Sequence, residues 1–313
     1  MRLQPVTTVS SISGANFRQH FFEPGIPVVI KDLAQSWPAM NRWNWDYMRE
    51  KVGEKKVGIY NNVKSGPHTP VNQADAYVTM GEYIDRVRSG PAEWRIFLFN
   101  IFNHAPELVQ DFTWPDHLMK GFVKRVPMLF MGGEGSITHM HFDMDLSHIL
   151  HTQFLGKKRV LLFPYEEGDK LYRKPFEVMS MADFSYYYDA SRSRLDMERY
   201  SALRHAKGYE VILDHGDTLF MPGGYWHHME YVQSGFAMSL RALQESWSKK
   251  FNGAWNLTVM RNIDTLMKKT VPHRWHEWKK RQVHARAARH IETTSDDCGG
   301  FAPSLGLLWK EER

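Results

Sequence analysis

The sequence predicts a mainly β fold with flanking helices, in which the strands form a sandwich or a barrel. From residue 127 to about residue 243, short apolar strands alternate with turns that contain Gly and Pro, a spacing typical of sandwiches and barrels. The pattern becomes helical after about residue 252, whereas residues 14–60 alternate short helical and extended pieces. In this 313-residue chain we therefore expect an N-terminal α/β portion (1–125), a β core (126–250) and a C-terminal helical region (251–313).

The N-terminal portion contains clear start and stop signals. Residues 26–30 (IPVVI) predict a strand entered through proline, and residues 95–99 (RIFLF) predict an apolar strand. Thr79, followed three residues later by Glu82, is a capping box that begins a helix. Ser-Gly-Pro at 89–91 ends this helix. We expect these elements to buttress the β core.

The β core is interrupted by one long irregular segment, which we call the insert (165–208). Strands are expected at 160–163, 218–221 and 236–243. The insert is polar, rich in Tyr and without clear periodicity, and such a long segment is often a functional cover over a site. After the core, residues 255–269 predict one helix, and a second helix follows Pro272.

The composition is that of an ordinary globular protein, with 42% hydrophobic and 24% charged residues. Aromatic residues are frequent, and the 11 Trp either fill a core or line a binding cleft. A single cysteine, Cys298, excludes an internal disulfide and favours a reducing compartment. No apolar run reaches the ~18 residues of a membrane span. The first residues lack the apolar segment of a secretory signal. We therefore expect a soluble, cytoplasmic protein.

Positive charge is concentrated near the C-terminus. The net charge is +5, and residues 271–292 contain six Lys or Arg against two Glu. A basic helix of this kind could contact nucleic acid. It could equally be the solvated face of a helix, and the sequence leaves both interpretations open.

Residue types that bind metals alternate between positions 139 and 145. On a strand, His139, His141, Asp143 and Asp145 would share one face. A lone His-x-Asp is weak evidence, and a second one at 215–217 has a central Gly that fits a tight turn better. A downstream strand presents the tandem pair at 227–228, so we interpret the two stretches as halves of one metal site. Hydrogen-bonded core histidines are the alternative.

Three motifs together resemble one known family. They are T-x-x-H-x-D at 138–143, Q-x-x-G-x-K at 153–158 followed by RVLLFP, and GDTLFMPGGYWHHME at 216–230. The opening FxxPGIPVVIKDLAQSWPA is similar as well, so the resemblance runs from about residue 17 to 250. The chain resembles the JmjC or cupin-like iron(II)- and 2-oxoglutarate-dependent oxygenases. Within them it looks most similar to the hydroxylase branch that includes the asparaginyl hydroxylase of hypoxia-inducible factor.

The resemblance implies a double-stranded β-helix, a jelly-roll barrel of the cupin and JmjC type, with a C-terminal helical pair. It implies that His141, Asp143 and His227 bind iron(II), while His228 points the other way. It also implies that Lys158 pairs with the distal carboxylate of 2-oxoglutarate and that Thr138 donates a hydrogen bond to the same end. A buried carboxylate needs such a cation and such a donor. The implied cofactors are Fe(II), the co-substrate 2-oxoglutarate and O₂.

Three departures from the family pattern affect the expected co-substrate pocket. Phe97 stands where the asparaginyl hydroxylases have a co-substrate-binding Tyr. The spacing between the His-x-Asp and Q-x-x-G motifs is two residues longer. Arg241 stands where Asn is common, and it is either a second carboxylate anchor or a surface charge. The departures leave the three iron ligands intact and argue against simply carrying over an asparagine substrate.

The resulting expectation is an iron(II)- and 2-oxoglutarate-dependent oxygenase that hydroxylates a protein side chain. The insert would present the protein or peptide substrate, and lysine demethylation is disfavoured because nothing suggests a chromatin-reading module. Alternatives are a non-catalytic, metal-binding cupin-type module and a hydroxylase of an RNA base or small molecule. In the hydroxylases that the chain resembles, such C-terminal helices often form a homodimer interface. The apolar side chains that could form one here could equally pack on their own barrel; they are Trp255, Leu257, Val259, Trp275 and Trp278.

Overall fold

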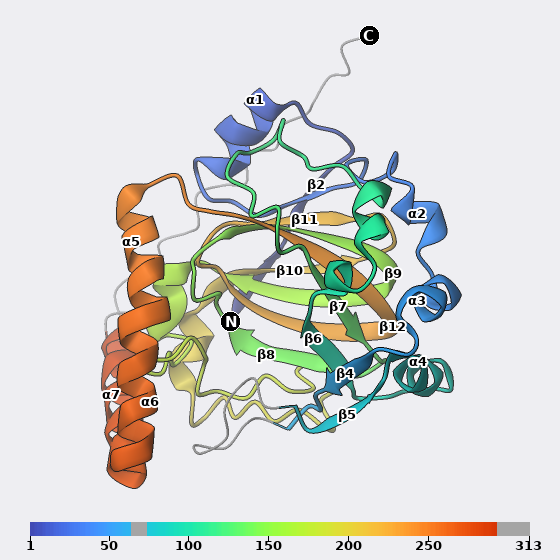
Figure 1. Cartoon of the computed structure of the whole chain (residues 1–313). Helices are drawn as coiled ribbons and strands as arrows, with labels where there is room; N and C mark the ends of the chain where they lie inside the picture. The colour runs from blue at the N-terminus through green and yellow to red at the C-terminus, as the bar shows by residue number, and fades with distance from the viewer. Residues whose placement is uncertain (64–73, 293–313) are drawn as a thin grey trace.

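The computed structural model of the chain describes residues 1–63 and 74–292 (Figure 1). Cys298 lies outside the described residues. The strands are β1 (Arg2–Pro5), β2 (Thr7–Val9), β3 (Val28–Ile30), β4 (Lys56–Ile59), β5 (Ala76–Thr79), β6 (Arg95–Phe99), β7 (Met128–Gly132), β8 (Ile137–His141), β9 (His148–Phe163), β10 (Lys207–Leu213), β11 (Thr218–Met221) and β12 (Trp226–Ala242). The α-helices are α1 (Gly14–Phe17), α2 (Ala39–Arg42), α3 (Trp45–Val52), α4 (Met80–Arg88), α5 (Trp247–Trp255), α6 (Arg261–Thr270) and α7 (Pro272–Glu292).

Two long strands build the frame of the fold. β9 and β12 pair antiparallel over almost their whole length, and register shifts near the middle bend both of them. On one side of the bend they belong to a sheet with the strand order β2-β3-β11-β9-β12-β7-β6. On the other side β9 pairs with β10 and β12 pairs with β8, which gives the order β1-β10-β9-β12-β8. The predicted double-stranded β-helix with C-terminal helices is confirmed.

Glycines allow the bend, and the bend changes which residues point inward. Gly156 has a φ of +72°, a conformation that favours glycine. A Cβ at Gly235 would lie 1.8 Å from the carbonyl oxygen of Leu155. The bulge breaks the alternation of side chains along β9. His151 before it and Lys158 after it therefore both face the interior, although their separation of seven residues is odd.

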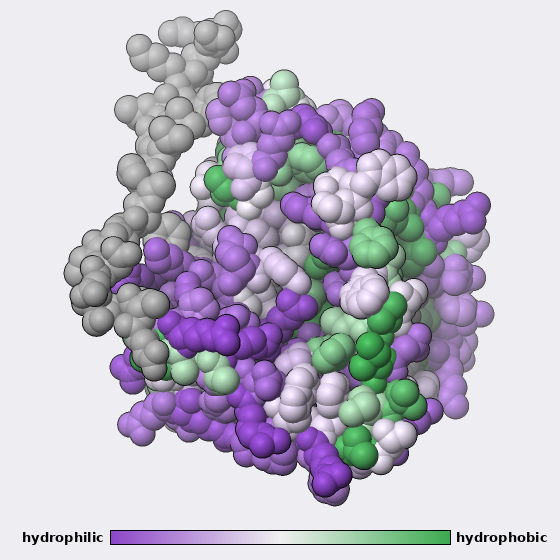
Figure 2. Space-filling view, turned by 90° about the vertical axis from the view of Figure 1, so that its left-hand side faces the viewer, coloured by the Kyte–Doolittle hydropathy of each residue, from purple (hydrophilic) through white to green (hydrophobic). Residues whose placement is uncertain are grey.

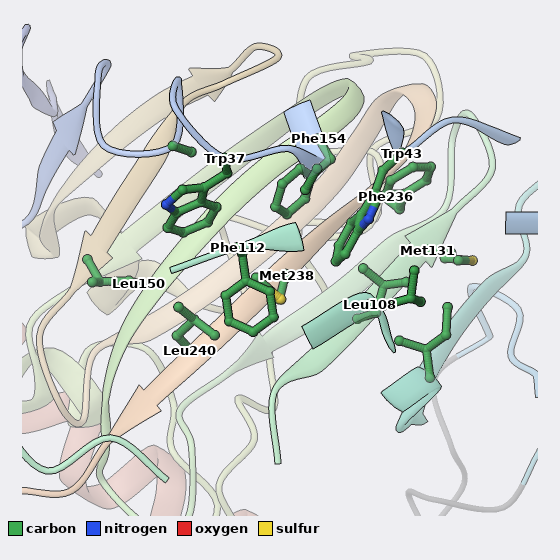
Figure 3. Packing of buried hydrophobic residues seen from close by; sticks show 14 of the residues in the cluster. Trp37, Trp43, Leu108, Phe112, Met131, Leu150, Phe154, Phe236, Met238 and Leu240 are labelled. Carbon is green, nitrogen blue, oxygen red and sulfur yellow. The ribbon is translucent and has the colours of Figure 1, made fainter. Parts of the chain in front are cut away.

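The N-terminal portion covers the outer face of the first sheet, as Figure 3 shows. Trp37 and Trp43 from this portion pack against Phe154 of β9, with ring centroids 6.3 and 4.8 Å away. Phe236 of β12 belongs to the same cluster. These Trp side chains therefore fill a core and do not line a cleft.

Local signals predicted several elements well. The helix expected after Thr79 is α4, and its capping box is present: the Glu82 amide donates to Thr79 Oγ1 over 3.2 Å, and Glu82 Oε2 accepts from the Thr79 amide at 2.7 Å. The strand expected at 160–163 was too short, because it is only the end of β9. The helix expected at 255–269 begins earlier, at Trp247, because α5 and α6 are joined through a π-helical turn at Asn256–Met260.

The insert and the last helix cover the outer face of the second sheet. The insert contains two short 3₁₀ turns, Tyr165–Asp169 and Ser201–His205, and otherwise irregular chain. Its apolar side chains pack with Trp226 of β12 and with Val283 of α7. In the part of the chain that is described, no helix is long and apolar enough to cross a membrane. The division at residues 125 and 250 remains a prediction.

The basic C-terminal helix is not simply a solvated face. Lys279 of α7 is buried and forms ion pairs with Asp264 of α6 and Glu177 of the insert. Lys268 joins the same two carboxylates. Lys279 therefore fastens the C-terminal helices to the insert and is not available to a nucleic acid. Arg286, a second of the six basic residues, also pairs with the insert, at Asp169.

Candidate metal centre

The barrel brings His141, Asp143 and His227 together. His141 ends β8, His227 is the second residue of β12, and the antiparallel register places these two residues directly opposite each other. Asp143 follows β8 by two residues. One potential ligand atom from each of the three side chains lies within 4.8 Å of the other two. The expected cluster thus exists as a compact set of two imidazoles and one carboxylate.

Hydrogen bonds orient both imidazoles toward the shared point. Nδ1 of His141 lies 2.8 Å from the carbonyl oxygen of His139, and Nδ1 of His227 lies 3.1 Å from that of Tyr225. A carbonyl only accepts, so each Nδ1 carries the proton and each Nε2 keeps its lone pair for a ligand. Burial lowers the pKa of His141 to about 4 and also lowers the pKa of His227. Both rings are therefore neutral near pH 7, as a metal requires.

The carboxylate is charged and only partly satisfied. Burial alone would raise the pKa of Asp143, but Arg241 and then the two imidazoles outweigh it and hold the pKa at about 2. Oδ1 accepts from Nη2 of Arg241 at 3.1 Å. The buried Oδ2 has no hydrogen-bond partner among the described residues. A buried anionic oxygen without a partner is costly unless a cation binds it, so the three side chains fit a divalent metal.

Arg241 connects this carboxylate to a second one. Its Nη1 lies 3.3 Å from both carboxylate oxygens of Asp145, which in turn accepts from the Ser147 hydroxyl at 2.8 Å. Asp145 follows the strand instead of sharing its face, which differs from the expected alternation. Arg241 is thus neither a surface charge nor a free cation. Its expected contact with the co-substrate remains a prediction.

A cavity of about 430 Å³ extends from the three side chains into the barrel. Its wall is mainly apolar and includes Phe97, where the expected Tyr hydroxyl is missing. Thr138 and Lys158 both line it, as does His139. His228 does not, because it follows His227 on the strand and faces outward.

Lys158 is the most deeply buried cation of the cavity. It is 1% exposed, and its Nζ lies 3.0 Å from Nε2 of His151 and 4.3 Å from the ring centroid of Tyr231. No carboxylate of the described residues lies within ion-pair distance. Burial lowers the pKa of Lys158 to about 7. The ammonium group is therefore placed to gain from an anion that enters the cavity.

Four further polar residues of the cavity were not predicted from the sequence, namely Arg95, His151, Tyr231 and Ser239. His151 lies outside the three family motifs. His151 and Lys158 are seven residues apart, and on a regular strand an odd separation places two side chains on opposite faces. The spacing therefore did not indicate that both side chains face inward. Arg95 shares a strand face with Phe97, and this period of two was the one signal that could have found it.

The sequence comparisons agree with this geometry. The family profile described as a cupin-like domain matches residues 14–256. The chain is 26% identical over 231 residues to lysine-specific demethylase 8 of Danio rerio, covering 71% of this chain and 54% of that protein. It is 25% identical over 258 residues to Jumonji C domain-containing protein 5 of Drosophila melanogaster, covering 76% and 62%. HSPB1-associated protein 1 of Homo sapiens is 26% identical over 228 residues, covering 66% and 45%.

The chain spans about half the length of the curated relatives it matches. The expected resemblance at the level of JmjC and cupin-like domains is confirmed. The closer similarity to the asparaginyl hydroxylase branch remains a prediction.

Proposed function

The chain belongs to the cupin-like family with JmjC relatives, and from this premise we propose that it is an iron(II)- and 2-oxoglutarate-dependent oxygenase that hydroxylates a protein side chain. The observation that supports the proposal most strongly is the set His141, Asp143 and His227 at one end of a cavity that also contains the buried Lys158. Two His and one carboxylate on one face are typical of non-haem iron(II) oxygenases.

In this proposal the three side chains hold iron(II), and Arg241 fixes the carboxylate of Asp143 through its Nη2 donor. When bound, iron(II) together with 2-oxoglutarate supplies the activation of O₂ and the oxidative decarboxylation that yields succinate. The carbonyl oxygens of His139 and Tyr225 keep the two imidazoles in the correct tautomer.

Lys158 and Thr138 bind the distal carboxylate of 2-oxoglutarate. Both line the cavity, and they come from strands on opposite sides of β12. Lys158 offers charge, and Thr138 offers a hydroxyl that donates to an anion. The apolar wall, which includes Phe97, excludes water from the space between them.

The charges of the cavity favour hydroxylation over lysine demethylation. The relatives named lysine-specific demethylases make demethylation the main competing activity. Asp143 is the one carboxylate that lines the cavity in the described part of the chain, whereas Arg95, Lys158 and Arg241 also line it. Arg241 is paired with Asp143 and Asp145, and in this proposal Lys158 is paired with the co-substrate. Arg95, which donates to the carbonyl oxygen of Asn61 at 2.6 Å, is then the cation of the described cavity lining that would repel a methylated ammonium group.

The insert provides the side of the cavity at which a substrate would bind. Its Val178 accepts a hydrogen bond from the amide of Phe142 over 3.1 Å, and Met179 forms a bridge with His141. Val178 and Met179 both line the cavity. The insert thus already pairs with the end of β8, and a peptide substrate that reaches the cavity would lie against Val178 and Met179.

Anaerobic titration with iron(II) and 2-oxoglutarate tests the oxygenase assignment, with Lys158→Ala as the matched control. We expect one equivalent of 2-oxoglutarate to bind to the wild type and much weaker binding to the variant. Metal binding without any 2-oxoglutarate binding would favour the alternative of a non-catalytic cupin-type module. Mass spectrometry of candidate peptides then separates the two activities, because hydroxylation adds one oxygen atom whereas demethylation releases formaldehyde.

A second copy of the chain is the proposed partner of the C-terminal helices. Trp247, Phe251 and Trp255 follow one another at intervals of four on α5, and they are 83%, 67% and 50% exposed. Leu266 of α6 is 60% exposed as well. Figure 2 shows the side of the molecule that carries the C-terminal helices, and a hydrophobic band runs over this face. Large exposed apolar patches mark interaction sites. Light scattering should show a dimer that Phe251→Glu dissociates, and a monomeric wild type would contradict the proposal.

A further inference from the structure

Lys158 has an unusual set of neighbours for a buried lysine. Its Nζ lies 3.0 Å from His151 Nε2, and His151 Nδ1 lies 2.8 Å from the hydroxyl of Ser239. The three side chains are 1%, 1% and 4% exposed. Ser239 stands directly opposite His151 in the pairing of β12 with β9. The lysine, the histidine and the serine thus form one continuous hydrogen-bonded chain inside the barrel.

The direction of each hydrogen bond follows from chemistry. An ammonium group only donates, so Nε2 of His151 accepts from Lys158. The proton of the neutral ring is then on Nδ1, which donates to the oxygen of Ser239. With the other tautomer, an N–H of His151 would face the ammonium group and the contact would be repulsive. Ser239 therefore accepts the Nδ1 proton of the tautomer that Lys158 requires and fixes the orientation of the ring.

The neutrality of these partners matters for a cation that must bind an anion. A carboxylate at position 151 would form an ion pair with Lys158 and compete with an incoming carboxylate. An imidazole takes one of the three donors of the ammonium group and leaves its charge uncompensated. The two remaining donors can point to the two oxygens of a carboxylate in the cavity.

We propose that His151 and Ser239 are positioning residues that hold Lys158 for the distal carboxylate of 2-oxoglutarate. The proposal rests on the proposed function, and it assigns this role to two residues outside the family motifs. Phe97 has no hydroxyl that could donate to the carboxylate of the co-substrate. In this chain the oriented ammonium group of Lys158 stabilises that carboxylate instead.

The test measures 2-oxoglutarate affinity separately from metal affinity. Isothermal titration under anaerobic conditions gives the Kd of Mn(II) and then the Kd of 2-oxoglutarate for each Mn(II)-loaded variant. His151→Phe keeps an aromatic ring that can pack on Phe130, whose ring centroid lies 6.3 Å from that of His151, but removes the acceptor. His151→Gln keeps an acceptor on a flexible side chain. Ser239→Ala removes the acceptor of the Nδ1 proton, which fixes the orientation of the imidazole.

We expect His151→Phe to raise the Kd of 2-oxoglutarate about tenfold, the effect of one hydrogen bond to a charged group. His151→Gln should recover most of this loss, and Ser239→Ala should raise the Kd about threefold. The Kd of Mn(II) should be unchanged in all three variants, because none of the substituted residues belongs to the metal-binding set.

The outcomes distinguish this inference from the proposed function. If the wild type does not bind 2-oxoglutarate, or if Lys158→Ala binds it equally well, the proposed function fails. If binding depends on Lys158 but His151→Phe binds as tightly as the wild type, only the positioning role is overturned. The role is also overturned if His151→Gln binds as weakly as His151→Phe, because the acceptor would then be irrelevant. Thermal unfolding of each variant confirms that it is folded.

Discussion

The affinity for 2-oxoglutarate should fall as the pH rises through the pKa of Lys158. Burial lowers this pKa to about 7, whereas a carboxylate bound to the ammonium group raises it again. Below pH 7 the free protein already carries the charge that binds the co-substrate. Above pH 7 Lys158 of the free protein is neutral, so binding must take up one proton. The sign is therefore a loss of affinity at high pH.

The size of the effect follows from linkage. Well above the pKa, one proton taken up per ligand corresponds to about a tenfold rise in Kd per pH unit. Because half of the lysine is already neutral at pH 7, the rise between pH 7 and pH 9 is about fiftyfold. Between pH 6 and pH 7 the metal-binding side chains add no pH dependence of their own, because the pKa of His141 is about 4 and that of Asp143 about 2. The dependence above pH 7 can thus be assigned to the lysine.

The assay is calorimetric titration of 2-oxoglutarate into the Mn(II)-loaded protein under anaerobic conditions from pH 6 to pH 9. Two buffers with different ionisation enthalpies at pH 8 count the protons directly. Lys158→Arg is the matched control, because a guanidinium group stays charged throughout this range and should bind with a flat pH profile. A flat profile for the wild type, with no proton uptake at pH 8, would refute the reasoning.

Three further substitutions test other parts of the structure. Arg241→Met removes the donor that fixes Asp143 and should raise the Kd of Mn(II) about tenfold, as is usual for residues that hydrogen-bond to metal ligands. An unchanged Kd of Mn(II) would show that Asp143 binds the metal equally well without its hydrogen bond from Arg241. Lys279→Met removes the buried cation of Asp264 and Glu177, which keep only the more exposed Lys268 as a shared partner, and should destabilise the protein by about 2 kcal/mol in denaturant unfolding, whereas Lys280→Met, at a partly exposed position, should change little. Thr79→Ala removes a capping box and should cost about 1 kcal/mol in the same measurement. If Lys279→Met is as stable as the wild type, the ion pairs of Lys279 do not stabilise the fold. If Thr79→Ala is as stable as the wild type, the capping box does not.

Features that depend on neighbours in sequence were predictable. The capping box that begins α4 requires only Thr79 and Glu82, three residues apart. His141 and Asp143 are also close in sequence, and the strand that presents His227 could be recognised from its apolar pattern. The approach of the three side chains was an expectation from family resemblance, and the barrel supplies its physical cause by pairing β8 with β12.

Features that depend on a change in strand geometry were not predictable. The bulge at Gly156 shifts the inward face of β9 by one residue, so the period of two that holds before the bulge fails after it. The contact of His151 with Lys158 was not predicted for this reason. The pairing of Arg241 with Asp145 joins residues 96 positions apart and has no local signal at all.

The burial of charged residues in the C-terminal helices was not predictable from the sequence either. Six basic residues in one helix indicate a polar face, and a sequence cannot tell which of them is buried. Lys279 is nearly inaccessible because α6 and the insert each place a carboxylate beside it. Burial of an ionised side chain requires such partners, and they come from segments far apart in the chain.

The most direct test of the account is the formation of succinate from 2-oxoglutarate by the purified protein with iron(II), ascorbate and air, without any other substrate. The account predicts slow, oxygen-dependent succinate formation that is abolished in Asp143→Ala. Succinate formation that persists in Asp143→Ala would contradict it, because the reaction would then not depend on the carboxylate that completes the metal-binding set.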